Sequence, residues 1–210
     1  MTQASAEPIT NERFNKGKTF QQYLDSGIRN RELFENNYNG LKVNEEQKAK
    51  LQALREKGLD HMVVIGEDWC PDVYRGLGVA QRIAEAAGIE MRMFERDQNK
   101  DMIQPYLKNG EFESIPVYVF YDKKNNVLGH FIERPKLANE QIHVTREVLG
   151  DTSPEGIAKT LGHEPSEDEI TAARAKAREK YMEWQNGDVW AGWRVAAVDE
   201  IIELLSPVLK

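Results

Sequence analysis

The residues around the single cysteine constrain the fold most, because a strand pattern leads into them and a helix pattern follows them. Met62–Ile65 is a short continuous apolar run, which is typical of a strand buried on both faces. The motif Glu67-Asp-Trp-Cys-Pro-Asp-Val73 comes next, and its proline suits the first turn of a helix. Apolar residues then recur at helical spacing as far as Gly88. A buried strand that passes into a helix within a few residues predicts an α/β fold.

The alternation of helix and strand patterns continues on both sides of this unit. Asn44 and Gln47 form a capping-box pattern, which predicts a helix that ends near Gly58. Three further strands and one further helix are expected: strands over 89–94, 115–121 and 127–132, and a helix over 99–108 that is interrupted at Pro105. Alternation followed by a hairpin predicts a mixed central sheet covered by helices on both faces.

The two ends of the chain are expected to be helical extensions of this domain. Residues 1–44 contain too many aromatic residues for a free tail, and 36–40 has the composition of a turn. Helices are predicted over 140–149, after Ser153 and after Ser166, and the Trp and Tyr residues of 181–193 are interpreted as a core that joins the last two helices. We therefore divide the chain into an extension, 1–44, a domain, 45–149, and a second extension packed on it, 150–210.

Composition narrows the class of function. A net charge of −7 over 210 residues argues against a nucleic-acid binder, and no apolar run approaches the roughly 20 residues of a membrane span. The polar start of the chain has no pattern of a signal peptide, and a lone cysteine cannot form an internal disulfide, so a cytoplasmic protein is expected. The four histidines are widely spaced and show no metal-ligand pattern, so no metal site is expected. No cofactor is expected either.

Residues 45–149 resemble the thioredoxin superfamily, and in particular the bacterial thioredoxin-like proteins. The resemblance rests on Trp69-Cys70-Pro71 after an apolar strand and on Ser114-Ile-Pro-Val117, which is similar to the strand start with a cis-proline in that fold. It also rests on the glycine-containing strand at 128–131, which ends at Glu133-Arg-Pro135. The resemblance implies a thioredoxin-like fold over about half of the chain.

The resemblance also implies a site. Cys70 occupies the position of the nucleophile, and five residues would contact the substrate: Trp69, Pro71, Asp72, Ile115 and Pro116. Two positions depart from the family pattern. Val73 stands where the second cysteine of the dithiol would be, and Val64 replaces the buried acid that precedes the nucleophile.

Opposing electrostatic effects are expected at the Cys70 thiol. The start of a helix favours the thiolate through its free N–H groups and its dipole. The carboxylates of Glu67, Asp68 and Asp72 oppose this effect and are expected to raise the pKa of the thiol, with Arg75 offsetting part of the increase. We therefore expect a thiol that is less activated than in a true thioredoxin.

Three hypotheses about function follow. The first is monothiol exchange between thiols and disulfides, in which a protein or a low-molecular-weight thiol supplies the missing resolving sulfur. The second is a redox-inactive binding or scaffold protein that keeps the fold, and the third adds a homodimer formed through the helical ends. The glycine pair at 76 and 78 inside a predicted helix indicates either close packing or a kink.

Overall fold

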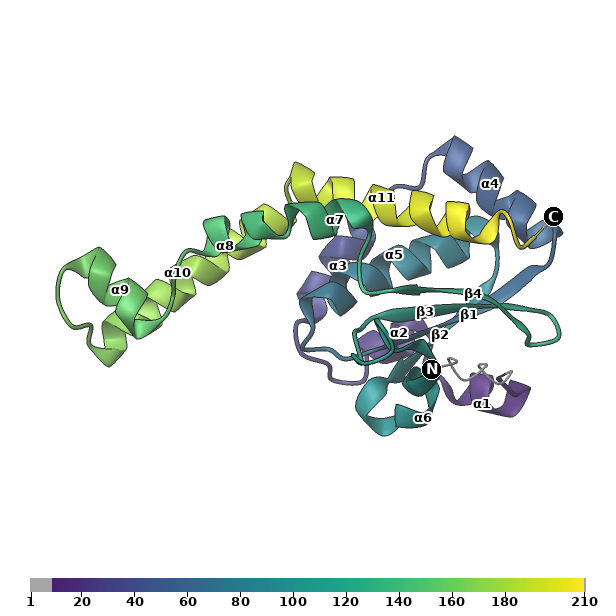
Figure 1. Cartoon of the computed structure of the whole chain (residues 1–210), viewed down its shortest axis with the longest axis horizontal. Helices are drawn as coiled ribbons and strands as arrows, with labels where there is room; N and C mark the ends of the chain where they lie inside the picture. The colour runs from purple at the N-terminus through teal and green to yellow at the C-terminus, as the bar shows by residue number, and fades with distance from the viewer. Residues whose placement is uncertain (1–8, 210) are drawn as a thin grey trace. The chain divides into compact units, whose positions relative to one another are not determined.

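A computed structural model describes residues 9–209, so that residues 1–8 and 210 lie outside the described part of the chain. Figure 1 shows its helices and strands. The strands are β1 (Leu59–Gly66), β2 (Glu90–Glu95), β3 (Val117–Asp122) and β4 (Val127–Ile132). The helices before β3 are α1 (Asn11–Lys16), α2 (Phe20–Leu24), α3 (Arg31–Asn39), α4 (Glu45–Glu56), α5 (Pro71–Ala87) and α6 (Lys100–Ile103), with the 3₁₀ turns η1 (Arg96–Gln98) and η2 (Gln104–Tyr106). The helices after β4 are α7 (Lys136–Gln141), α8 (His143–Leu149), α9 (Pro154–Leu161), α10 (Glu167–Gln185) and α11 (Asp188–Leu205).

The strands form one mixed sheet in the order β2-β1-β3-β4. β1 pairs parallel to β2 and antiparallel to β3, and β4 pairs antiparallel to β3 at the edge. β1 has a neighbour on each side, which explains why its run Met62–Ile65 is fully buried and continuously apolar. The predicted mixed sheet is therefore confirmed.

Helices cover both faces of the sheet, as predicted. On one face, α5 packs so closely that a Cβ atom at Gly66 would lie 2.8 Å from the methyl groups of Val73. On the other face, the ring of Phe14 from α1 meets the ring of His61 at 4.6 Å between centroids, and Tyr106 of η2 meets His130 at 5.0 Å. The sequence thus forms a three-layer α/β arrangement around a single sheet.

Local signals fixed several helix ends where they were expected. The capping box of Asn44 and Gln47 is present at the start of α4, and Ser166 and Glu169 form another at the start of α10. The left-handed Gly88 ends α5. These ends were predictable because each depends on contacts within a few residues.

Two expectations were wrong. Residues 36–39 are not a turn but the last part of α3. Within it, the Asn37 side-chain amide donates to the Leu33 carbonyl oxygen at 2.8 Å and accepts from Arg194 at 3.0 Å, so that this polar side chain is satisfied in the helix. The helix expected over 140–149 is divided into α7 and α8. At the division, Nδ1 of His143 lies 3.1 Å from the carbonyl oxygen of Glu140. The histidine side chain thus contacts a carbonyl group near the end of α7, where helices lack backbone N–H donors.

The chain forms two compact units. Of the described residues, the first comprises 9–135 with 194–209 and contains the sheet, and the second comprises 136–193. In the second unit, the rings of Tyr181, Trp184, Trp190 and Trp193 pack against one another, so that the expected aromatic core joins α10 to the start of α11. The predicted division into 1–44, 45–149 and 150–210 stays a prediction. It separates the part of the chain that resembles a known family from its two extensions, and compact units do not test that separation.

Across residues 9–209, no helix combines the length and the apolar composition that crossing a bilayer requires.

The close approach of α5 to the sheet explains the glycine pair. A Cβ atom at Gly76 would lie 2.1 Å from the hydroxyl oxygen of Tyr118 and 2.9 Å from Pro116, and one at Gly78 would lie 2.6 Å from the backbone nitrogen of Tyr38. The glycines therefore serve close packing rather than a kink, which outweighs their poor helix propensity.

This packing gives the first testable prediction. Gly76→Ala should lower the free energy of unfolding by about 1–3 kcal/mol, because the buried Tyr118 must move to admit the methyl group. The matched control is Gly192→Ala, also in a helix, where the nearest atom outside the helix backbone would be 4.0 Å away. Urea unfolding of both variants tests this. Equal stability of Gly76→Ala and the wild type would contradict the close contact.

Candidate functional site

Cys70 lies where β1 passes into α5. It is the N-cap residue of α5, with an extended backbone, and Pro71 occupies the first helical turn. The side chain is partly buried, and its Sγ atom lies 3.7 Å from the carbonyl oxygen of Ile115. The Ile115–Pro116 peptide bond is cis. The structure therefore brings together Cys70, Ile115 and Pro116, three of the residues that the sequence placed in the site.

The two positions that depart from the family pattern are filled by packing. Val73 and Val64 both have 0% exposed surface. Cys70 is the only cysteine among the 210 residues. No second thiol or buried acid of this chain therefore stands at either position to act on Cys70.

The pKa of the Cys70 thiol is raised above its ordinary value. Burial is the largest cause, and the carboxylates of Asp72 and Glu133 raise it further. Backbone N–H groups of Val73 and Asp72 lower it, as expected at a helix start, but they do not reverse the shift. At neutral pH the thiol form therefore predominates, and the contact with the Ile115 carbonyl oxygen is an S–H donor contact.

Asp72 is held by two guanidinium groups. Its carboxylate oxygens lie 2.7 Å from Arg75 and 3.0 Å from Arg134, and the Arg75 side chain is only 3% exposed. Arg75 thus pairs directly with Asp72, and the expected offset of the Cys70 pKa by Arg75 stays a prediction. Because Arg75 and Arg134 engage both oxygens, Asp72 is a fixed anion beside Cys70. A contact of Asp72 with substrate stays a prediction.

Glu133 is a member of the site that sequence reasoning missed. Its carboxylate pairs with Lys108 and Arg134, and its backbone N–H donates to the carbonyl oxygen of Pro116 at 2.7 Å. Its φ of +68° is in the left-handed region, which is uncommon for a residue other than glycine. The charged pair Glu133-Arg134 directly after a strand was the available signal, but only the fold shows that it lies near Cys70.

Trp69 forms an exposed aromatic surface next to Cys70. Its side chain is 48% exposed, and the Arg96 guanidinium lies 5.4 Å from the ring centre. Arg96 is itself paired with Asp97 at 2.7 Å. Pro71 is also exposed. Trp69 and Pro71 are therefore accessible to a partner, as a substrate-binding role requires.

The remaining acids of the motif are bound to neighbouring segments. Asp68 accepts the backbone N–H of Arg29 at 2.7 Å, and Glu67 accepts that of Asp97 at 2.7 Å. The expectation that Asp72 raises the pKa of Cys70 is confirmed, whereas Glu67 and Asp68 join the cysteine loop to the segments before α3 and after β2.

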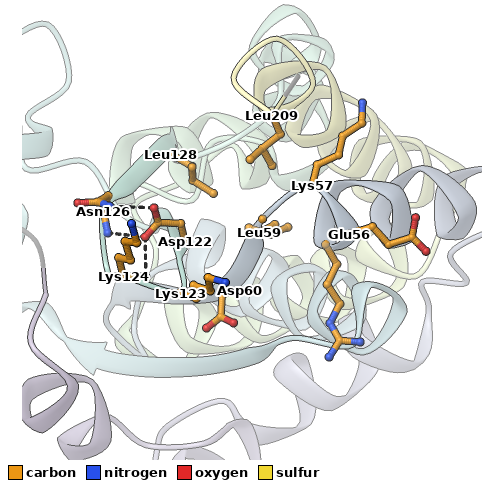
Figure 2. A pocket seen from close by; sticks show the side chains of 12 residues that line it. Glu56, Lys57, Leu59, Asp60, Asp122, Lys123, Lys124, Asn126, Leu128 and Leu209 are labelled. Atoms are coloured by element: carbon orange, nitrogen blue, oxygen red, sulfur yellow. Dashed lines mark hydrogen bonds between the residues drawn. The ribbon is translucent and has the colours of Figure 1, made fainter.

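A hollow of about 540 Å³ lies at the other end of β1 (Figure 2). Leu59, Leu128 and Leu209 line it together with charged residues, and Leu59 is the first residue of β1 whereas Cys70 follows the last. Figure 2 shows the bonds between Asp122 and Asn126 at its rim. This hollow is therefore separate from the Cys70 site. Within residues 9–209, no group of three or more His, Cys, Asp or Glu side chains is arranged to hold a metal ion.

A thiol at the start of the first long helix after a central strand, beside a cis-proline that precedes an antiparallel strand, defines the thioredoxin fold. A family model described as Thioredoxin matches residues 17–147, more than half of the 210 residues. The chain therefore belongs to this thioredoxin family. The match begins at residue 17, so that it includes α2 and α3, which precede the resemblance seen in the sequence.

Two solved structures are similar to this chain. An HIV epitope scaffold is 19% identical with a TM-score of 0.56, and the alignment covers 92% of this chain and 95% of the scaffold. A Pseudomonas aeruginosa protein of unknown function is 19% identical with a TM-score of 0.54, over 83% of this chain and 98% of that one. At this identity the likeness shows the fold alone. No curated protein matches the sequence.

The ion pairs of Asp72 give the second prediction. Asp72→Asn removes a negative charge beside Cys70, so the pKa of the thiol should fall and its alkylation by iodoacetamide at pH 7 should be about twofold to fivefold faster. The matched control is Asp68→Asn, two residues before Cys70, whose carboxylate faces Arg29 instead. A slower or unchanged rate in Asp72→Asn would show that Asp72 does not act on the thiol.

Proposed function

We propose that this chain is a monothiol protein of the thioredoxin fold that exchanges thiols and disulfides with the help of an external thiol. The observation that carries this proposal is the position of the Cys70 Sγ atom at the start of α5, 3.7 Å from the carbonyl oxygen that precedes the cis-proline. A sulfur there is next to free N–H groups that stabilise a thiolate and next to a backbone edge that can bind an extended chain.

The proposed reaction has two steps. The Cys70 thiolate attacks one sulfur of a disulfide, forms a mixed disulfide and releases the other sulfur as a thiolate, which takes up a proton. An external thiolate then attacks the partner's sulfur in the mixed disulfide, so that a new disulfide leaves and Cys70 is restored. The second step needs a protein or low-molecular-weight thiol because Val73 provides no sulfur.

Each residue of the site has a proposed role. Cys70 is the nucleophile, the backbone of Ile115 and Pro116 binds the substrate chain, and Trp69 with Pro71 forms the exposed rim. Asp72 as a substrate contact stays a prediction, and its carboxylate, which pairs with Arg75 and Arg134, also raises the pKa of the thiol. A cytoplasmic location and a homodimer stay predictions.

One observation favours a second candidate function, a redox-inactive binding protein. Burial raises the pKa of Cys70, and the acids Asp72 and Glu133 add to the increase, so the resting site disfavours the reactive thiolate. In this alternative, the same exposed Trp69 and the same backbone edge bind a partner with no covalent step.

The pH dependence of mixed-disulfide formation tests the proposal. Because the pKa of Cys70 is raised, the rate with glutathione disulfide should be low at pH 7 and rise with pH beyond about 8.5, the ordinary range of a thiol. Mass spectrometry of the intact chain measures the adduct, and Cys70→Ser is the control. No adduct on the folded chain at any pH, with a normal adduct on the urea-unfolded chain, would favour the binding protein.

Val73→Cys provides a sharper test of the missing thiol. Valine and cysteine are similar in size, so the buried position should accept the change. The introduced thiol should resolve the mixed disulfide, releasing glutathione and leaving an internal disulfide, whereas the wild type should retain the adduct. The control is Val64→Cys, also fully buried but outside the family's dithiol spacing. A stable adduct in Val73→Cys would contradict attack by Cys70 in a thioredoxin-like geometry.

A further inference from the structure

The second compact unit contains an apolar hollow that the Cys70 chemistry does not use. Its volume is about 470 Å³, within the range of small-molecule sites. It is formed by the end of α8, the following segment, α9 and α10. The lining residues are Leu149, Gly150, Asp151, Thr152, Ile157, Thr160, Leu161, Glu169, Ala172, Ala173, Lys176, Ala177 and Lys180.

Small and aliphatic side chains give the hollow its apolar character. Ile157 of α9 is buried, whereas the neighbouring Leu161 is 43% exposed, although leucine side chains are commonly buried. On the α10 side, Ala172, Ala173 and Ala177 extend only one carbon from the helix and so leave space between it and α9. An apolar ligand in this space would cover surface that now faces water.

The unpaired charge at the hollow is positive. Lys176 and Lys180 lie one helical turn apart on α10, and among the residues that the structure describes neither forms an ion pair. The two carboxylates of the lining have other partners. Asp151 accepts the Ser153 backbone N–H at 2.9 Å, and Glu169 accepts that of Ser166 at 2.9 Å.

We propose that this hollow binds a fatty acid or a similar long-chain carboxylate, with the alkyl chain against α9 and the carboxylate at Lys176 and Lys180. The volume and the aliphatic lining match the alkyl chain of such a ligand. The two unpaired lysines, one helical turn apart on α10, match its carboxylate. An acidic amphipathic helix would be negatively charged like the fatty acid. It would, however, need a longer groove, because its apolar side chains at i, i+3, i+4 and i+7 would all have to bind. The hollow is closer in size to a single alkyl chain. This inference is independent of the proposed function of Cys70.

Displacement of a fluorescent fatty acid tests the proposal on the full chain. 11-(Dansylamino)undecanoic acid should become brighter on binding, and laurate below its micellar range should displace it. Dodecan-1-ol, which has the same chain length without the carboxylate, should compete more weakly. Lys176→Gln/Lys180→Gln should weaken laurate binding about threefold to tenfold, the effect of losing two exposed ion pairs.

The matched control is Arg174→Gln/Arg178→Gln. It removes two positive charges at the same spacing from the same helix, but at exposed positions that do not line the hollow. Laurate binding to this variant should stay within about twofold of the wild type. Ala173→Leu, which fills the hollow and keeps a good helix former, should weaken both laurate and the alcohol.

Three outcomes would overturn the inference. One is that laurate does not displace the probe, and another is that Lys176→Gln/Lys180→Gln binds laurate as the wild type does. The third is displacement by an acidic amphipathic peptide but not by laurate, which would assign the hollow to a protein partner. Circular dichroism of each variant verifies that its helices are intact, so that a loss of binding can be assigned to the hollow.

Discussion

The close packing of α5 against the sheet is the constraint on which the site depends. Gly66 in β1 and Gly76 in α5 leave no room for a Cβ atom where Val73 and Tyr118 pass them. The first turn of α5 is therefore held at a fixed depth against β1 and β3. Cys70 precedes that turn and the cis-proline precedes β3, so the same contacts set the distance between the thiol and the Ile115 carbonyl oxygen.

Ion pairs hold the surrounding loops at this junction. Arg134, which follows β4, bonds to Asp72 of α5, while Glu133 bonds through its backbone to Pro116 and through its carboxylate to Lys108. Four segments thus meet around one partly buried thiol. These ion pairs also affect the thiol, because the carboxylates of Asp72 and Glu133 raise the pKa of Cys70. Stability of the loops and activation of the thiol are opposed here.

The parts of the fold that were predictable from sequence depend on local signals. The apolar run of β1, the caps at Asn44 and Ser166, and the terminating Gly88 each act within one element, and each lies where it was expected. The thiol and the cis-proline were placed by a resemblance to a family. Of the two errors, the one at residues 36–39 involves a distant contact, whereas the division of α7 from α8 involves a contact between residues three apart. Arg194 bonds to Asn37 in α3 from 157 residues away, and no local pattern indicates this contact.

The contrast between local signals and distant contacts also explains why sequence reasoning missed Glu133. Glu133 acts on Cys70 from 63 positions along the chain, through a loop whose backbone is fixed by Pro116 and Arg75. Val73 packs against Gly66 with no exposed surface, so the family's second thiol position now contributes to the core instead of to exchange. Because valine and cysteine are similar in volume, Val73 fills this position without leaving a cavity. The fold therefore does not depend on a second cysteine there. Any chemistry that remains at Cys70 must then begin from a thiol whose protonated form the site favours, and must obtain its second sulfur from another molecule.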